Sequence, residues 1–442
     1  MIATAALAVL AGTVLSCFLA ILPGLHIYNV MGLVAMLIYW LQGMGIAVNP
    51  EVYLPFMIGL VVGWSVLNTI PSVLLGAPDE SAIFTVLPGQ KYLMTGRGYE
   101  GTLIIGAGSL VGLFMIVFII GPFAPKYLPV ARYVLSPHMH WILWVIITFI
   151  LITEWPKGGN WGPAGWRKFF DAWSTLGAGL LTFILSGLLG FILLYRAPVN
   201  IDNAFQNIMP AFVGLFAIPW CLLNALSGAK VPKQYVCDTL NINGDLLLRS
   251  GIAGGIGGGF AAFFPVVTGG VGGLLAGHAT AQRDERVFLM SQGVSKVVYY
   301  TGALMLFFVP GLFLTRGGGA WILKGLYTPR TWGDYYLALG SIAIAGGVSF
   351  LLLPPLTKAT LWLMKKVDYR LISLFALAII IGLVFSITGW VGLFIMTVST
   401  GIGLLPVLFG SRRLNCLGVL LLPIACNMSG IGEPIAAFLG LL

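Results

Sequence analysis

Long apolar runs separated by short polar loops make up almost the whole chain. Eleven stretches of 19 residues or more contain no Asp, Glu, Lys or Arg: residues 1–50, 52–78, 101–125, 133–153, 172–195, 203–229, 250–282, 297–315, 335–357, 371–411 and 414–432. A membrane-spanning helix needs about 20 apolar residues. Because the runs 1–50 and 371–411 are long enough for two passes each, the pattern predicts about ten to twelve membrane segments, some of them re-entrant.

The composition supports an all-α polytopic membrane protein in the cell membrane. Hydrophobic residues make up 59% of the chain and charged residues only 8%, whereas soluble domains carry roughly 25% charged residues. This excludes a cytosolic enzyme, a nucleic-acid-binding protein and a disordered scaffold. The sequence contains no hydrolase, zinc or haem signature. We therefore expect no enzymatic activity and no cofactor other than a coupling Na⁺ or H⁺. The sequence does not indicate whether the protein has a metal site.

The net charge of +9 comes from basic residues in short loops. The clearest of these are Lys358, Lys365, Lys366 and Arg370, followed by Arg412 and Arg413. Basic loops usually face the cytoplasm, so we interpret the excess as a signal of membrane orientation and not of a nucleic-acid partner. The five cysteines, Cys17, Cys221, Cys237, Cys416 and Cys426, form no CxxC pair and are expected to be packing residues.

Two pairs of prolines indicate an internal duplication. Pro23 and Pro265 lie 242 residues apart in similar apolar surroundings, and Pro71 and Pro310 lie 239 residues apart. The nearly equal offsets predict two transmembrane repeats, residues 1–200 and 201–442. We expect the two repeats to be inverted relative to each other.

Proline inside a helix removes a backbone hydrogen bond, and the freed carbonyl groups need partners at membrane depth. Broken segments in corresponding positions of two halves point to a transporter's binding site, with the N-termini of half-helices directed into it. The sequence therefore predicts re-entrant hairpins at Pro23–Gly24 and at Pro265; the alternative is a simple kinked helix. After the second break, Thr268, Gly269 and Gly270 are the expected ligand-binding residues. The other glycines of residues 250–277 are expected to serve close packing.

The segment from Asn68 to Glu100 contains two adjacent acids, Asp79 and Glu80, in otherwise apolar surroundings. An acid inside the membrane indicates function, and we expect these two to bind a coupling Na⁺ or H⁺. The alternative is that Asp79 or Ser81 caps the helix after Pro78. Ser72, in the same segment, is a candidate substrate-binding residue.

Three further polar residues are candidates for the binding site. Lys296 has apolar or small neighbours for several turns; it either extends to the membrane surface or anchors an anion. His26 and Asn29 directly follow the first break. Histidine there can bind an anion or carry a proton, although a lone histidine in an apolar stretch is often only structural.

Four groups of residues resemble a known family. They are LPGLHIYN (22–29), IPSVLLGAPDESAIFTVLPGQKYLMTGRGYEGTL (70–103), GLFAIP (214–219), and FFPVVTGGVGGLLAG with SQGV (263–277 and 291–294). With these motifs the sequence resembles the large membrane subunit of the tripartite tricarboxylate transporters, in its divergent archaeal stand-alone branch. The resemblance implies secondary transport of a tri- or dicarboxylate coupled to Na⁺ or H⁺. It also implies a small membrane subunit and an extracellular binding protein as partners; a homodimer is a further possibility.

FFPVVTGG is also similar to an element of the polyprenyl-phosphate translocases, which have paired re-entrant segments too. A lipid-phosphate head group would suit Lys296, His26 and the half-helix ends equally well. Translocation of polyprenyl phosphate is therefore the alternative function. A membrane-embedded enzyme or scaffold is a third hypothesis.

Overall fold

The computed structural model describes residues 2–22, 25–77, 81–155, 165–199, 208–226, 231–279 and 284–442. All regular elements in these ranges are helices, which confirms the predicted all-α fold class. Eight helical stretches within them are long and apolar enough to cross a membrane, and a bent pair, Arg413–Met428 with Gly432–Phe438, raises the number to nine. The protein is therefore a multi-pass membrane protein. The ten to twelve segments predicted from the sequence included broken and short membrane segments. The count of eight or nine includes only helices long enough to cross a membrane and one bent pair.

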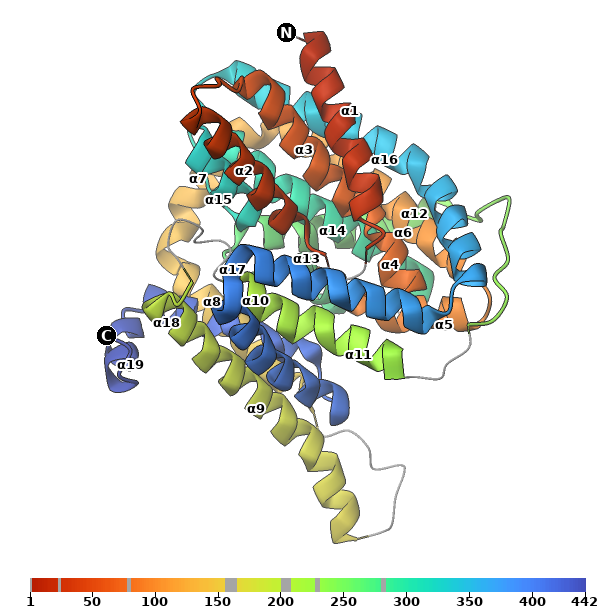
Figure 1. The fold of residues 1–442 in the computed structure, drawn as a ribbon, viewed down its shortest axis with the longest axis vertical. Coiled ribbons are helices and arrows are strands. Elements are labelled where there is room, and N and C mark those ends of the chain that lie inside the picture. Colours follow the sequence, from red (N-terminus) through yellow and green to blue (C-terminus); the bar gives the residue numbers. More distant parts are fainter. Residues whose placement is uncertain are drawn as a thin grey trace. The chain divides into compact units, whose positions relative to one another are not determined.

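The chain forms two compact units (Figure 1). Unit 1 contains Met1–Arg132 and Asn224–Ala376, and unit 2 contains Tyr133–Leu223 and Leu377–Leu442. Each unit thus takes segments from both halves of the sequence. The predicted repeats, residues 1–200 and 201–442, are defined by similarity between the two halves of the sequence. The division into compact units does not test that similarity, so the repeats stay a prediction.

Unit 1 contains the helices that carry most of the predicted site. They are α1 (Ile2–Leu19), α2 (Ile27–Gly43), α3 (Pro50–Leu67), α4 (Thr69–Leu74), the 3-10 turn η1 (Ile83–Thr85), α5 (Val86–Met94), α6 (Gly98–Phe114), the π-helical turn η2 (Met115–Ile120), most of α7 (Gly121–Leu135), α12 (Gly244–Phe263), α13 (Gly269–Ala279), α14 (Glu285–Phe308), α15 (Gly317–Leu326) and α16 (Trp332–Lys366).

Unit 2 contains the remaining helices. They are η3 (Ser136–His138), α8 (Met139–Ile152), α9 (Trp166–Arg196), α10 (Met209–Phe212), the π-helical turn η5 (Val213–Ala217), α11 (Ile218–Leu226), most of α17 (Tyr369–Leu408), η6 (Arg413–Leu417), α18 (Gly418–Met428) and α19 (Gly432–Phe438). Helix α17 is kinked at Gly389, whose φ of 64° and ψ of −156° are not helical.

Glycines allow two helix pairs of unit 1 to pack with their backbones in contact. A Cβ atom at Gly12 of α1 would lie 2.0 Å from the Phe56 carbonyl oxygen of α3. A Cβ atom at Gly254 of α12 would lie 2.4 Å from the Ser291 carbonyl oxygen of α14. Gly12 and Gly254 both lie eleven positions before the proline of their break. Small residues at such interfaces let membrane helices approach closely.

Helices α12 and α13 form a tight helical hairpin around the second break. A Cβ atom at Gly257 would lie 2.4 Å from the Gly272 carbonyl oxygen, and one at Gly272 would lie 2.0 Å from the Gly257 carbonyl oxygen. Since Gly257 lies eight residues before Pro265 and Gly272 seven after it, α13 folds back along α12. This is the local geometry expected of a hairpin; whether it is re-entrant in a membrane stays a prediction.

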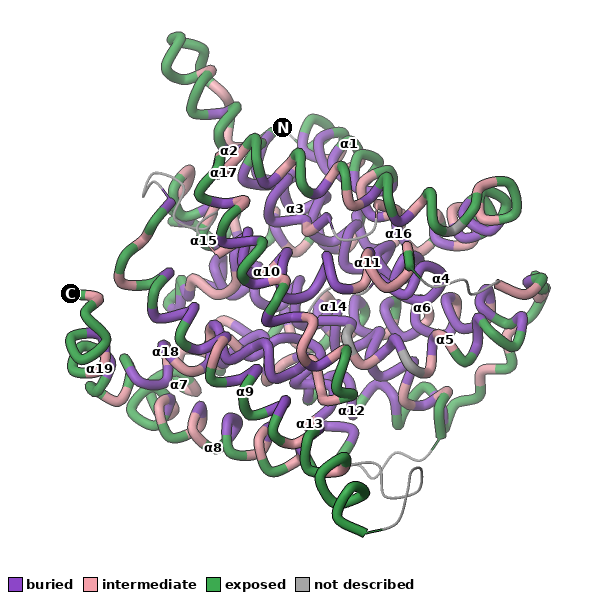
Figure 2. The backbone as a smooth tube through the Cα atoms, turned by 60° about the horizontal axis from the view of Figure 1, so that its bottom comes forward, coloured by how far each residue is buried: buried purple, intermediate pink, exposed green. Residues whose placement is uncertain are grey.

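Helix α14 lies in the core of unit 1, and every residue from Leu289 to Phe308 is buried (Figure 2). It packs against α3, α6, α12 and α13. Although it has 24 residues, α14 is not among the candidate membrane spans, since polar side chains interrupt its apolar sequence. This enclosed helix therefore carries polar groups whose burial is costly.

The predicted packing role of the cysteines agrees with the structure. Cys17, Cys221, Cys416 and Cys426 are buried, and Cys237 is partly exposed. All five are free thiols.

Candidate functional site

The polar run of α14 places several hydrogen-bonding side chains in the interior of unit 1. Its sequence, SQGVSKVVYYT, occupies residues 291–301. Residues four apart share one face of a helix, so Gln292 and Lys296 project from neighbouring turns on the same side. A buried polar group is costly unless it is bonded or serves a ligand. The face of α14 that bears these residues is therefore the natural starting point for a site.

Lys296 is buried, with only 2% of its surface exposed. Its Nζ donates a hydrogen bond of 2.9 Å to Thr69 Oγ1 at the start of α4. This decides between the two hypotheses for Lys296: its side chain lies inside the protein and does not extend to the membrane surface. The ammonium group therefore lies beside the junction between α3 and α4, two residues before Pro71.

Gln292 is 1% exposed, and neither its Nε2 nor its Oε1 has a hydrogen-bond partner within the protein. The amide group lies against α13, since a Cβ atom at Gly273 would come within 2.7 Å of Nε2 and 2.8 Å of Oε1. An amide buried without partners costs about 1–3 kcal/mol for each unsatisfied group. Such a cost is expected where a ligand supplies the missing partners.

The first break is joined to α14 through His26. His26 caps α2: its Nδ1 accepts a hydrogen bond of 3.2 Å from the backbone N–H of Tyr28. Its Nε2 lies 3.2 Å from the hydroxyl of Tyr300 in α14. Because Nδ1 acts as an acceptor, the neutral ring carries its proton on Nε2, which then donates to Tyr300. The rings of Tyr28, Tyr300 and Trp64 surround His26.

The second break adjoins the same helix. At the turn, Val266 has a φ of 55°, which is strained for a β-branched residue. Thr268 directly precedes α13, and its hydroxyl oxygen accepts a hydrogen bond of 3.5 Å from the backbone N–H of Val271. Ser295 of α14 donates a hydrogen bond of 2.7 Å to the carbonyl oxygen of Gly269, which fixes the first turn of α13 against α14.

The change from α3 to α4 forms a third irregular point. Asn68 separates the two helices. The Ser72 hydroxyl donates to the carbonyl oxygen of Asn68 at 2.7 Å and to Oδ1 of Asn68 at 3.0 Å. Ser72 thus stabilises the chain beside Thr69, the residue that holds Lys296. Its hydroxyl is 1% exposed and is used locally.

The structure brings most of the described candidates to one region of unit 1. His26, Thr268, Gly269 and Lys296 are connected through α14 by the contacts given above, and Ser72 lies one turn from the partner of Lys296. Asn29 is buried in the first turn of α2, and Pro265 and Gly270 flank the start of α13. Pro23, Gly24, Asp79 and Glu80 lie outside the described residues, so their predicted roles stay predictions.

Four residues of this region were not predicted from the sequence: Trp64, Thr69, Gln292 and Tyr300. Trp64 is fully buried, and its Nε1 has no hydrogen-bond partner within the protein. Gln292 alone carried a usable signal, because it stands four residues before the unusual lysine. The other three are recognisable only from contacts between helices distant in the sequence.

The region combines a buried ammonium group, an amide that can donate and accept, and the N-terminal ends of α2 and α13. A helix N-terminus presents N–H groups and a partial positive charge, which favour an anion. Among the described residues, the fully buried charged side chains are Lys296 in this region and Glu154 in unit 2. The chemistry available at Lys296 is therefore that of holding a small anion.

Comparison with known proteins identifies the family of the chain. The model of the tripartite tricarboxylate transporter TctA family matches residues 6–418. The chain belongs to this family. The match spans both units and all the described site residues, from His26 to Lys296. The TctA family is a family of membrane transporters of tricarboxylates. The roles of Lys296 and of the other candidate residues stay predictions.

One relative of this TctA-family chain is an uncharacterized protein of Methanocaldococcus jannaschii. It is 27% identical over 427 residues, which cover 94% of this chain and 96% of the relative. No solved structure matches the chain. The similarity to the archaeal relative therefore extends over nearly the whole length of both chains.

Proposed function

We propose that this TctA-family protein is a secondary active transporter of a small organic anion, a tri- or dicarboxylate, coupled to Na⁺ or H⁺. The observation that carries the proposal is the buried Lys296 ammonium group on α14. In this region α14 contacts the residues that follow each break. Tyr300 contacts His26 after the first break, and Ser295 contacts Gly269 after the second. Ion pairing and helix N-termini together favour a carboxylate there.

The site residues divide into two roles in this proposal. Lys296, His26 and Thr268, with the backbone N–H groups after Pro23–Gly24 and around Gly269–Gly270, bind the substrate anion. Asn29 and Ser72 support the surrounding backbone and complete the polar lining. Movement of the α12–α13 hairpin relative to α14 would open the site, because the hairpin covers the Gln292 face of α14.

Asp79 and Glu80 are proposed to take the coupling cation. They follow α4, whose first residue holds Lys296. Replacing both acids by the corresponding amides, Asp79→Asn with Glu80→Gln, is expected to abolish ion dependence and leave the fold intact. The measurement is uptake into proteoliposomes with and without a Na⁺ or H⁺ gradient. An unchanged ion requirement in the double variant would show that coupling occurs elsewhere.

A thermal-shift panel on the detergent-purified protein tests the substrate. The ligands are citrate, C4-dicarboxylates, inorganic phosphate and a short-chain polyprenyl phosphate, each with and without Na⁺. A ligand that binds only the folded state raises stability by RT ln(1 + [L]/Kd). We expect a saturable shift with a carboxylate, enlarged by the coupling ion. A shift only with polyprenyl phosphate would reject carboxylate transport in favour of lipid-phosphate translocation.

A small membrane subunit and an extracellular binding protein are proposed partners, on the basis of the family alone. The test is reconstitution of the purified chain by itself. Carboxylate uptake that needs an added binding protein would support a tripartite system, whereas full uptake by the single chain would support a stand-alone transporter.

A further inference from the structure

A second polar cluster lies in unit 2, around the loop between α17 and α18. Within residues 411–415, four side chains each have a buried polar atom with no hydrogen-bond partner in the protein: Ser411 Oγ, Arg412 Nη1, Arg413 Nη1 and Asn415 Oδ1. Three of these atoms can donate, and two of those belong to guanidinium groups. So many unsatisfied atoms in five consecutive residues is unusual, because most buried polar groups in proteins are bonded.

The backbone of this loop is held firmly, although the guanidinium groups are not paired. Glu154, at the end of α8, is 1% exposed. Its Oε2 accepts hydrogen bonds from the Arg412 backbone N–H at 3.0 Å and from Asn415 Nδ2 at 2.8 Å. The ion pairs found among the described residues, Lys91–Glu285, Arg97–Glu100 and Arg249–Asp245, do not involve this loop.

Arg413 is positioned by an aromatic ring. Its Cζ lies 3.7 Å from the centroid of the Trp220 ring in α11. This contact holds the guanidinium group against the ring, and a guanidinium group can bind phosphate or carboxylate through two parallel hydrogen bonds. The cluster is thus equipped to bind an anionic oxygen group.

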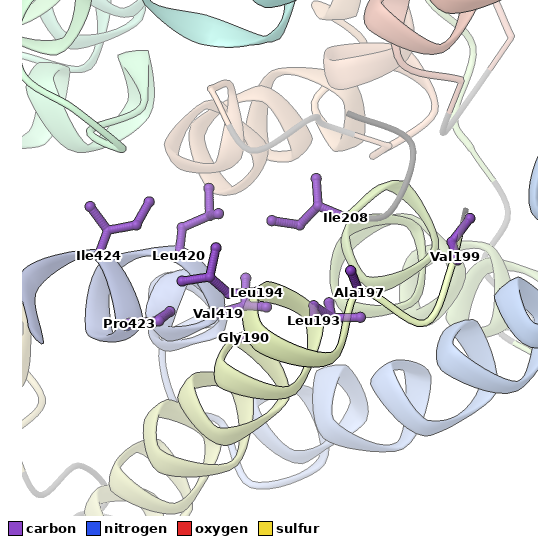
Figure 3. A pocket seen from close by; sticks show the side chains of 10 residues that line it. All are labelled: Gly190, Leu193, Leu194, Ala197, Val199, Ile208, Val419, Leu420, Pro423 and Ile424. Atoms are coloured by element: carbon purple, nitrogen blue, oxygen red, sulfur yellow. The ribbon is translucent and has the colours of Figure 1, made fainter. Parts of the chain in front are cut away.

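An apolar cavity lies farther along the same unit (Figure 3). It has a volume of about 250 Å³ and is lined only by apolar residues: Gly190, Leu193, Leu194, Ala197, Val199, Ile208, Val419, Leu420, Pro423 and Ile424. In Figure 3, Leu420 and Ile424 of α18 lie on one side, and Ile208 points toward them. None of these residues has a polar side chain.

The polar cluster and the cavity lie on consecutive parts of the chain. Arg413 begins η6, and four residues of α18, the helix that follows, line the cavity: Val419, Leu420, Pro423 and Ile424. Ile424 is eleven positions after Arg413, which is about 16 Å at 1.5 Å per residue. One half of the hydrocarbon core of a bilayer is about 15 Å thick. The separation is therefore close to the length of one acyl chain, from its head group to the middle of the bilayer.

We propose that unit 2 binds one anionic membrane phospholipid, with its phosphate at Ser411, Arg412 and Arg413 and an acyl chain in the apolar cavity. The phosphate supplies acceptors for the unpartnered guanidinium N–H groups, and the chain fills a cavity that water would not occupy. Arg412 and Arg413 lie in a basic loop of the kind that faces the cytoplasm, where anionic lipids attract such loops. This site is independent of the carboxylate site in unit 1.

The test is lipid binding by the purified full-length chain, measured by native mass spectrometry and by thermal shift. Dioleoyl phosphatidylglycerol is compared with dioleoyl phosphatidylcholine and with inorganic phosphate. We expect one saturable phosphatidylglycerol per chain, at least tenfold weaker binding of phosphatidylcholine, and no shift with phosphate alone. Equal binding of the two lipids would overturn the proposal, and so would a shift of the same size with phosphate alone, which would indicate a free-anion site.

Two variants address the two ends of the site separately. The double substitution Arg412→Gln with Arg413→Gln removes the cations, and Leu420→Trp fills the cavity. Each is expected to weaken phosphatidylglycerol binding at least tenfold. The matched control is the double substitution Lys365→Gln with Lys366→Gln in α16, which removes two neighbouring exposed cations. It is matched to the arginine pair because Lys366 Nζ also lies over a tryptophan ring, 4.2 Å from the centroid of Trp362. This control should bind the lipid as the parent protein does.

The outcomes remain decisive even when one variant fails to fold. Leu420→Trp and the comparison of the two lipids do not require the arginine variant. Unchanged binding in Leu420→Trp would show that no acyl chain occupies the cavity. An equal loss in the lysine control would show that general charge, and not this loop, attracts the lipid.

Discussion

Lys296 of α14 donates a hydrogen bond of 2.9 Å to Thr69 at the start of α4, and the two residues are 227 positions apart in the chain. Both are buried. The bond holds an ammonium group in the interior of a membrane protein, where an uncompensated charge is strongly unfavourable. It also joins the first half of the sequence to the second at the region where the predicted binding segments meet.

Replacing Lys296 with methionine is expected to abolish carboxylate uptake and leave the protein folded, because methionine fits a similar volume without the charge. Thr69→Val should weaken substrate affinity about tenfold, since it removes a hydrogen bond to a charged group worth about 1.5 kcal/mol or more. Uptake by proteoliposomes and the Tm of each variant are the measurements. Normal transport by Lys296→Met would exclude an anion-binding role.

Substitutions that keep the helix cap but remove the contact with Tyr300 distinguish a structural role of His26 from a functional one. His26→Ala removes the cap of α2 and should lower stability by about 1 kcal/mol. His26→Asn keeps a capping side chain but is too short to reach Tyr300. We expect His26→Asn to retain the parent Tm and to lose at least tenfold in uptake, as Tyr300→Phe should. Full uptake in both would assign His26 to capping alone.

Gln292 should show opposite effects on stability and transport. Gln292→Leu replaces an unpartnered amide with an apolar group of similar size, so stability should be unchanged or raised by about 1 kcal/mol. Substrate binding should nevertheless be lost. The control is Ser295→Ala, three residues away, which removes a hydrogen bond of 2.7 Å to Gly269 and should lower the Tm. A clear decrease in the Tm of Gln292→Leu would show that the amide stabilises the fold.

The hairpin of α12 and α13 depends on direct backbone contact. Gly272→Ala would place a methyl group 2.0 Å from the Gly257 carbonyl oxygen, so we expect loss of folding or of transport. Gly259→Ala, in α12, is the matched control because no atom lies within 4 Å of the added Cβ. It should be neutral, or stabilising by up to about 1 kcal/mol. Equal behaviour of the two variants in expression and Tm would contradict the tight hairpin.

The unusual residues were recognisable from the sequence, but their partners were not. The spacing of Pro23 and Pro265 indicated where the helices break, and the Pro265 break lies between α12 and α13 as expected. Lys296 was conspicuous because a charge is rare in an apolar run. Its two possible environments, however, differ only in which way the side chain points, and the contact with Thr69 decides this.

The same limit applies to Gln292 and to the loop of Arg412 and Arg413. A glutamine among small residues, or two arginines after a membrane helix, are ordinary in a sequence. They become notable only when the packing leaves their polar atoms buried and without partners. Such a state depends on helices from distant parts of the chain.

The sequence by itself determined that this chain is an all-α multi-pass membrane protein, where its helices break and which charges are exceptional. Those properties follow from local hydropathy and backbone chemistry, which each segment carries with it. Only the tertiary structure decided that Lys296 meets Thr69, that His26 meets Tyr300 and that Gln292 faces α13. These contacts join segments that are distant in the chain, and a single sequence does not specify which of the many apolar faces will pair.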